Sequence, residues 1–421
     1  MSWTRAAVIV AAAALGAAAL LALIARAPEA VRRTEVPRGA TDPRLGDSFT
    51  AAQVARHGEY RRAGYAAFSL RITVVMVTLV VLCRGPMARL VAALEVVPGG
   101  WAVRAALAGA ATALLLVAAG LPVGFVHGYI NQHAWGLATQ DIGAWASDRL
   151  RSAALSAVMA AVAAVAFFGV VRWQPRTWWG WGWLVFTALN AAAAFLWPLV
   201  VAPLFNRFTP LEDGSLRQRV VGLADAAGID VGEVLVADAS RRSTIENAYV
   251  AGFGGSKRIV LYDTLVSAGG ERETEFVVAH ELGHRIERHV VKNLMIASAG
   301  LAAGFGALLW LSARSGPWSW AGAAGIGDLR ALPLLVLLVL VANLVALPVE
   351  TAISRRFEAR ADEIALELTG DPDTAVRVFR RLAFSNLADL RPPAPVRWFF
   401  FHHPPPADRI RAAIVTGSAA P

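Results

Sequence analysis

Seven stretches of about 20 residues contain almost no charged side chains, and a water-facing fold could not hide that much apolar surface. A helix needs roughly 20 apolar residues to cross the hydrocarbon core of a bilayer. The stretches are residues 6–24, 64–83, 105–126, 153–171, 183–205, 294–311 and 332–349. They predict a mainly α-helical, multi-pass membrane protein with about seven transmembrane helices. The second stretch is the weakest, because it contains Arg71.

Arginine supplies almost all of the basic excess, which gives a formal net charge of +9, and it is concentrated after the first stretch. The cluster consists of Arg26, Arg32, Arg33, Arg38, Arg44, Arg56, Arg61 and Arg62. Such a segment resists translocation, so it should be cytoplasmic and the amino terminus outside. The cluster also argues against a cleaved signal peptide. We therefore read the charge as membrane topology and expect no nucleic-acid partner.

The soluble segments divide the chain into four parts. Residues 1–205 form an N-terminal membrane region with five spans, and residues 206–293 form the first part of a catalytic domain. Residues 294–349 contain the sixth and seventh spans, and residues 350–421 form the second part of the catalytic domain and the C-terminal tail. Short runs rich in β-branched residues predict a small β element within the catalytic domain. By the alternation of spans, this domain is cytoplasmic.

His280, Glu281 and His284 form a His-Glu-x-x-His pattern in a proline-free segment that has the apolar spacing of a helix. Histidines four residues apart lie one turn apart on one face, so both imidazoles can reach one metal ion. Glu281 points about 100° away, where it can act as general base on a water at the metal. The pattern predicts a zincin-like helix with one Zn²⁺ per chain.

A catalytic zinc needs a third protein ligand. On a continuous helix His289 lies about 180° from His280 and should face solvent or lipid headgroups, while Glu287 lies two turns below it. The ligand is therefore expected from another element. Glu358 and Asp362, four residues apart after the seventh span, suit this role: one carboxylate can bind the metal while the other accepts the N–H of a ligand histidine.

From about residue 205 to residue 413, the chain resembles the integral-membrane zinc endopeptidases that include the type I CAAX prenyl proteases. The resemblance rests on short motifs besides His280 to His284. They are Asp238 to Arg242, Asn247 to Tyr249, Lys257 to Leu265, Ser354 to Asp362, and His403-Pro404-Pro405 followed by Asp408-Arg409-Ile410. One departure is Glu246, which stands before Asn247 where the family usually has a small polar residue.

The resemblance implies a role for each matching residue. His280, His284 and Glu358 would be the zinc ligands, Glu281 the base and later proton donor, and Asp362 the partner of a ligand histidine. His403 would stabilise the oxyanion, and Arg409 would anchor the tail near the metal. The edge strand, which corresponds to Asn247, Ala248 and Tyr249 together with the Lys257 to Tyr262 stretch, would bind an extended substrate by β-augmentation.

The expected function is hydrolysis of peptide bonds in peptides, or in the C-terminal segments of proteins that carry a prenyl group. The enzyme would sit in the lipid bilayer of a bacterial plasma membrane, with its site on the cytoplasmic side. A quality-control metalloprotease without prenylated substrates is the nearest alternative. A transporter or channel with a structural metal site is a third, which the nearly charge-free spans disfavour.

Overall fold

The computed structural model describes residues 1–26, 49–252 and 257–419. Within these residues, seven helices are long and apolar enough to cross a membrane, which confirms the predicted number. They contain α1 (Trp3–Ile24), α3 (Ala51–Cys83), α5 (Gly100–Phe125), α7 (Ile142–Trp173), α8 (Trp178–Leu196), α13 (His289–Ser312) and α15 (Leu332–Thr369). Several extend beyond their apolar stretch. Four of the clustered arginines lie outside the described residues, namely Arg32, Arg33, Arg38 and Arg44.

Shorter helices connect or extend the spans. They are α4 (Pro86–Leu94), α6 (Gln132–Ala134), α9 (Ala202–Phe205) and α14 (Ser315–Trp320). Wider π-helical turns join α5 to α6 at Val126–Asn131 and α8 to α9 at Trp197–Val201. Pro198 lies in the second turn, where its missing N–H removes a helical hydrogen bond and favours such a local rearrangement.

Small residues allow the membrane helices to approach closely. A Cβ atom added to Gly109 of α5 would lie 2.5 Å from the carbonyl oxygen of Ala160 in α7. A Cβ atom at Gly182 of α8 would lie 2.3 Å from the Phe305 ring of α13. Helices in a bilayer associate through such van der Waals contacts, because the surrounding lipid is as apolar as their side chains.

The predicted β element is a four-stranded sheet with the order β1-β2-β4-β3. Its strands are β1 (Phe208–Pro210), β2 (Glu233–Ala237), β3 (Ala248–Ala251) and β4 (Arg258–Tyr262). The β2 and β4 strands are parallel, while β1 and β3 run antiparallel to their neighbours. Among the described residues β3 pairs only with β4, so its other side is an edge of the sheet.

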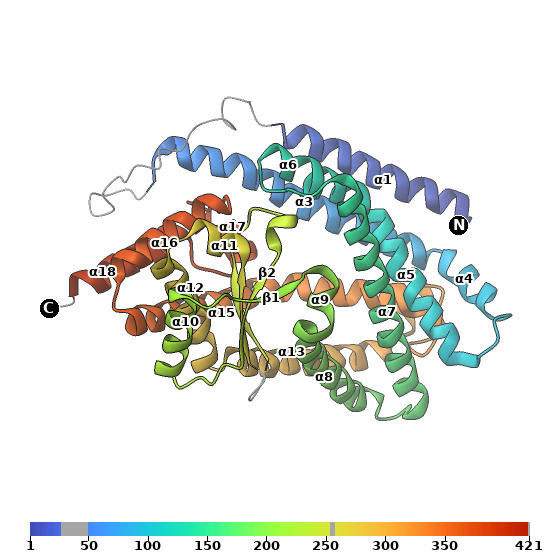
Figure 1. Ribbon diagram of the computed structural model, residues 1–421. Coiled ribbons are helices and arrows are strands. Elements are labelled where there is room, and N and C mark those ends of the chain that lie inside the picture. Colours follow the sequence, from blue (N-terminus) through green and yellow to red (C-terminus); the bar gives the residue numbers. More distant parts are fainter. Residues whose placement is uncertain (27–48, 253–256, 420–421) are drawn as a thin grey trace.

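Helices surround this sheet and gather at the end of the molecule where the carboxyl terminus lies, opposite the amino terminus (Figure 1). They are α10 (Ser215–Ala226), α11 (Asp263–Ala268), α12 (Glu271–Ile286), α16 (Pro372–Ser385), α17 (Ala394–Phe400) and α18 (Pro406–Ala419). Their apolar faces form one buried cluster that includes Phe276 of α12, Phe379 of α16 and Ile410 of α18. The two soluble segments, far apart in sequence, thus share one core.

The N-terminal end of α3 holds the loop after α16 in place. Arg61 donates to the carbonyl oxygens of Leu387 at 2.6 Å and Asn386 at 3.0 Å. The Nδ1 of His57 lies 2.7 Å from the carbonyl oxygen of Ala388. The Tyr65 hydroxyl donates to Asp389 at 2.9 Å. These contacts explain why α3 continues as a helix well before its apolar stretch begins.

Candidate metal centre

Two helices cross where the metal-binding motif lies. Glu271 and Glu273 occupy the first turn of α12, where carboxylates stabilise the positive end of a helix. Further along α12, Gly283 packs directly on α15, because a Cβ atom there would lie 3.1 Å from the Cα of Ala361. This close crossing places His280 and His284 opposite Glu358.

The ligand atoms of His280, His284 and Glu358 all lie within 4.8 Å of one another. The His280 Nε2 lies 3.2 Å from the His284 Nε2 and 3.2 Å from a Glu358 oxygen. The other Glu358 oxygen lies 3.4 Å from the His284 Nε2. Two imidazole nitrogens and one carboxylate are the donor set of a three-ligand catalytic zinc site, so these residues fit the metal.

Asp362 lies behind the first histidine. Its Oδ1 is 2.8 Å from the His280 Nδ1, which leaves the Nε2 of that ring facing the other ligand atoms. Arg409 donates to both Asp362 oxygens, at 2.7 Å from Nε and 2.5 Å from Nη2, and its guanidinium lies over the Phe379 ring. Arg409 thus connects α18, through Asp362, to His280.

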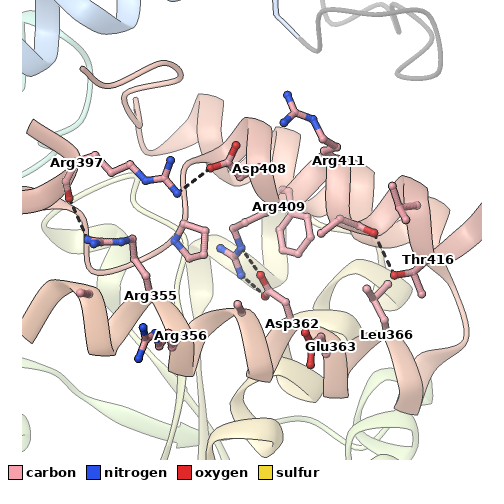
Figure 2. A pocket seen from close by; sticks show the side chains of 16 residues that line it. Arg355, Arg356, Asp362, Glu363, Leu366, Arg397, Asp408, Arg409, Arg411 and Thr416 are labelled. Carbon is pink, nitrogen blue, oxygen red and sulfur yellow. Dashed lines mark hydrogen bonds and ion pairs between the residues drawn. The ribbon is translucent and has the colours of Figure 1, made fainter. Parts of the chain in front are cut away.

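Figure 2 shows that Arg409 and Asp362 form part of the wall of a cavity between α15, α17 and α18. Its volume is about 790 Å³. Most of its arginines have partners in the wall: Arg397 pairs with Asp408 at 3.2 Å, and Arg355 donates to the carbonyl oxygens of Arg397 and Phe401. These contacts hold the C-terminal segment against α15 beside the candidate metal ligands.

Two further groups with predicted roles lie at the ligands. The His403 Nδ1 is 2.6 Å from a Glu358 oxygen, and the His403 side chain is 60% exposed. Glu281 follows His280 directly on α12. Removal from water raises the pKa of Glu281 to about 7, and the charge of Glu358 acts in the same direction, whereas His280 and Arg409 oppose it.

His289 does not face solvent or lipid, so that expectation is wrong. The chain turns at Arg288, whose φ of 53° is in the left-handed region, and α13 starts at the next residue. His289 is 3% exposed, and its Nδ1 lies 2.8 Å from the Nδ1 of His284. Its ring stacks on Phe357 at 4.2 Å with an angle of 13° between the planes. The 180° separation from His280 expected on one continuous helix does not apply, because the helix is interrupted at Arg288.

The predicted substrate strand begins at Ala248, one residue later than expected, and the Lys257 to Tyr262 stretch is not part of an edge, because β4 lies between β2 and β3. Asn247 precedes β3, and its side-chain oxygen accepts the N–H of Ala248 at 2.9 Å. The Tyr262 N–H donates to the Asn247 carbonyl, so by the alternation of antiparallel pairs Tyr249 also turns its backbone toward β4. Ala248 and Val250 therefore direct their backbone groups to the free edge, where Arg285 of α12 donates to the Val250 carbonyl at 2.7 Å.

Glu246, the departure noted in the sequence, is a buried part of the support of this strand. Arg381 of α16 lies 3.0 Å from its carboxylate, and burial raises the pKa of Glu246. The Asn386 side chain accepts the Glu246 N–H at 3.1 Å and donates to its carbonyl at 3.3 Å. Because α3 holds residue 386, a membrane helix supports the start of β3. Sequence reasoning missed Asn386, which no motif marks.

Family models match both halves of the chain. Residues 210–415 match the model described as Peptidase family M48, and residues 29–207 match the model described as CAAX prenyl protease N-terminal, five membrane helices. The first match contains all of the ligand residues described above.

Individual proteins give similar results. The chain is 32% identical to the metalloprotease YhfN of Bacillus subtilis over 295 residues, which cover 70% of this chain and 69% of that protein. It is 32% identical to CAAX prenyl protease 1 of Saccharomyces cerevisiae over 179 residues, 42% of this chain and 39% of the yeast protein. The crystal structure of S. mikatae Ste24p superposes with a TM-score of 0.74 at 22% identity, covering 97% of this chain and 98% of that chain. That likeness concerns the fold.

Proposed function

Because this chain belongs to peptidase family M48 and is a membrane metalloendopeptidase similar to the CAAX prenyl proteases, we propose that His280, His284 and Glu358 bind a catalytic zinc ion. The observation that carries the proposal is the approach of their three ligand atoms to within 4.8 Å, with Glu281 next in sequence to one of them. Membership of a peptidase family also removes the interpretation as a transporter or channel. When bound, the zinc supplies Lewis-acid activation of the hydrolytic water and of the scissile carbonyl.

Glu281 performs the proton transfers in this proposal. Its carboxylate accepts a proton from the water as the water oxygen attacks the carbonyl carbon. It then donates that proton to the amine nitrogen as the C–N bond breaks. A pKa raised to about 7 suits both steps, because the group can hold and release a proton near neutrality. His403 would donate to the developing oxyanion, a role supported by its position 2.6 Å from Glu358.

The substrate is proposed to pair as an extended strand with β3, through the outward Ala248 carbonyl and Val250 N–H, because the Ala248 N–H and the Val250 carbonyl are already bonded to Asn247 and Arg285. This arrangement modifies the predicted role of Tyr249, whose backbone belongs to the β4 ladder. Asn247 acts by fixing the Ala248 N–H, and Asn386 by fixing the preceding residue. The edge strand is therefore aligned before substrate arrives.

Replacing Val250 with proline tests the pairing. The Val250→Pro change removes the outward N–H without removing a bond of the β4 ladder. We expect kcat/KM for a quenched peptide to fall about 10-fold, the value of one lost hydrogen bond, mainly through KM. The Val250→Ala variant keeps the N–H and should retain nearly all activity. Equal losses in both variants would show that the side chain, rather than the backbone edge, matters.

The substrates are proposed to be C-terminal segments of membrane-associated proteins. The relatives named CAAX prenyl protease support this class, and the Bacillus relative shows that the fold also serves a bacterium. Paired peptides of one sequence, with and without a farnesylated cysteine, test whether a prenyl group is recognised. A lower KM for the lipidated peptide supports CAAX-type processing, whereas equal values favour the quality-control alternative.

The arginines of the α3 extension support a site on the cytoplasmic side of a bacterial plasma membrane. Two single cysteines in a Cys83→Ala background test this orientation, since Cys83 is the one native thiol and is buried. Asp213 lies in the catalytic region with an 89% exposed side chain, and Ser315 is exposed between the sixth and seventh spans. We expect an impermeant maleimide to label Ser315→Cys in intact cells and Asp213→Cys after lysis alone. The reverse pattern would overturn the orientation.

A further inference from the structure

We infer that His289 is a positioning residue for the metal: its Nδ1 accepts the Nδ1–H of His284 and so holds the Nε2 of His284 toward the ion. The inference rests on the proposed function, because it takes His284 as a ligand. Nothing in the His-Glu-x-x-His motif requires a histidine at this position. It is the turn at Arg288 that brings His289 to the site.

The direction of the hydrogen bond follows from ligand chemistry. A neutral imidazole that gives the lone pair of one nitrogen to a metal carries its proton on the other. The His284 Nε2 lies 3.2 Å from the His280 Nε2 and 3.4 Å from Glu358, so it is the metal-facing nitrogen. Its Nδ1 therefore carries the proton and donates across 2.8 Å to His289.

The same logic applies to the other ligand histidine, whose Nδ1 donates to Asp362. Outer partners of this kind fix the ring orientation of metal ligands and raise their affinity for the ion. Each histidine of the motif thus has its own acceptor, a carboxylate from α15 for His280 and an imidazole from α13 for His284. Without His289, the ring of His284 would have no such partner among its contacts in the structure.

The surroundings of His289 hold it in place. Its ring stacks on Phe357, the residue before the ligand Glu358, so the contact joins α13 to α15 at the metal. Glu287, on the other side of the turn, bridges Lys292 of α13 at 2.8 Å and Arg360 of α15 at 3.1 Å. Because His289 is 3% exposed, little water can compete for its Nδ1. The turn is therefore fixed by contacts to both helices.

Two substitutions distinguish the role of the His289 Nδ1 as a hydrogen-bond acceptor from the role of its ring in packing. His289→Phe keeps a flat ring for the stack on Phe357 but removes the acceptor. His289→Asn loses the ring, while its Oδ1 takes the place of Nδ1. The measurement is zinc retention of the purified full-length protein in detergent, by competition with a chromophoric chelator. We expect His289→Phe to bind zinc 10- to 100-fold more weakly, and His289→Asn to stay within about threefold of wild type.

The Phe357→Leu variant is the control, because it removes the stack and leaves the acceptor. Equal zinc loss in Phe357→Leu and His289→Phe, or in His289→Asn and His289→Phe, would reduce His289 to a packing residue. Wild-type retention in His289→Phe would also refute the inference, and the proposed function would stand if Glu358→Ala still lost the metal. If wild-type protein binds no zinc, or Glu358→Ala keeps it, the proposed function itself fails.

Discussion

The Glu281→Gln variant is expected to bind zinc as the wild type does and to hydrolyse a quenched peptide about 10²- to 10⁴-fold more slowly. The amide has nearly the shape of the carboxylate but cannot accept the proton of the attacking water. The ligand atoms of His280, His284 and Glu358 are left unchanged. The loss should appear in kcat, measured with purified protein in detergent, while metal analysis gives the wild-type zinc content.

Glu275 offers a matched control, since it lies on the same helix and pairs with Arg219 at 3.2 Å. The Glu275→Gln variant should keep wild-type activity, because an exposed ion pair contributes little. Substantial activity in Glu281→Gln would rule out Glu281 as the base. Activity that is indifferent to o-phenanthroline would rule out the metal-dependent reaction altogether.

The Glu358→Ala variant is expected to lose zinc and, with it, peptide hydrolysis. It removes one of three protein ligands and the carboxylate that both histidines and His403 approach. Removing a residue that only hydrogen-bonds a metal ligand already weakens metal binding by about 10- to 100-fold. Removing a ligand itself should therefore weaken zinc binding by at least about 100-fold. Metal content after gel filtration and chelator competition measure the loss.

Glu363 provides the control on the same helix. Its side chain is 61% exposed and pairs with Arg360 away from the metal ligands. The Glu363→Ala variant should therefore retain zinc and activity. Full zinc occupancy in Glu358→Ala would mean that the third ligand lies elsewhere.

The membrane fold could be predicted because each span satisfies a simple physical requirement, a run of apolar residues long enough to cross the bilayer. The N-terminal extension of α3 beyond its apolar stretch could not be predicted from the sequence. Its first turns are polar, and they are stabilised by contacts of His57, Arg61 and Tyr65 with a loop more than 300 positions away in sequence. Such contacts leave no local pattern in either segment.

The candidate ligands were predictable for a similar reason, since a fixed spacing on a helix places His280 and His284 on one face. Glu358 and Asp362 were found as a pair of suitable chemistry, and the crossing at Gly283 brings them to the histidines. The expected position of His289 was wrong because the helix is interrupted at Arg288, which has a positive φ. Arginine seldom adopts this conformation, so the sequence gives no sign of the interruption. Local spacing therefore identifies ligands on regular elements, and it fails where an element is interrupted.

The uninterrupted course of α15 sets a length scale for the reaction. The apolar part of this helix ends near Val349, and Glu358 follows nine residues later in the same helix, about 14 Å along its axis. An extended chain covers that distance in about four residues. If the substrate is anchored in the bilayer beside this helix, as proposed, the bond that reaches Glu358 should lie about four residues from the anchor.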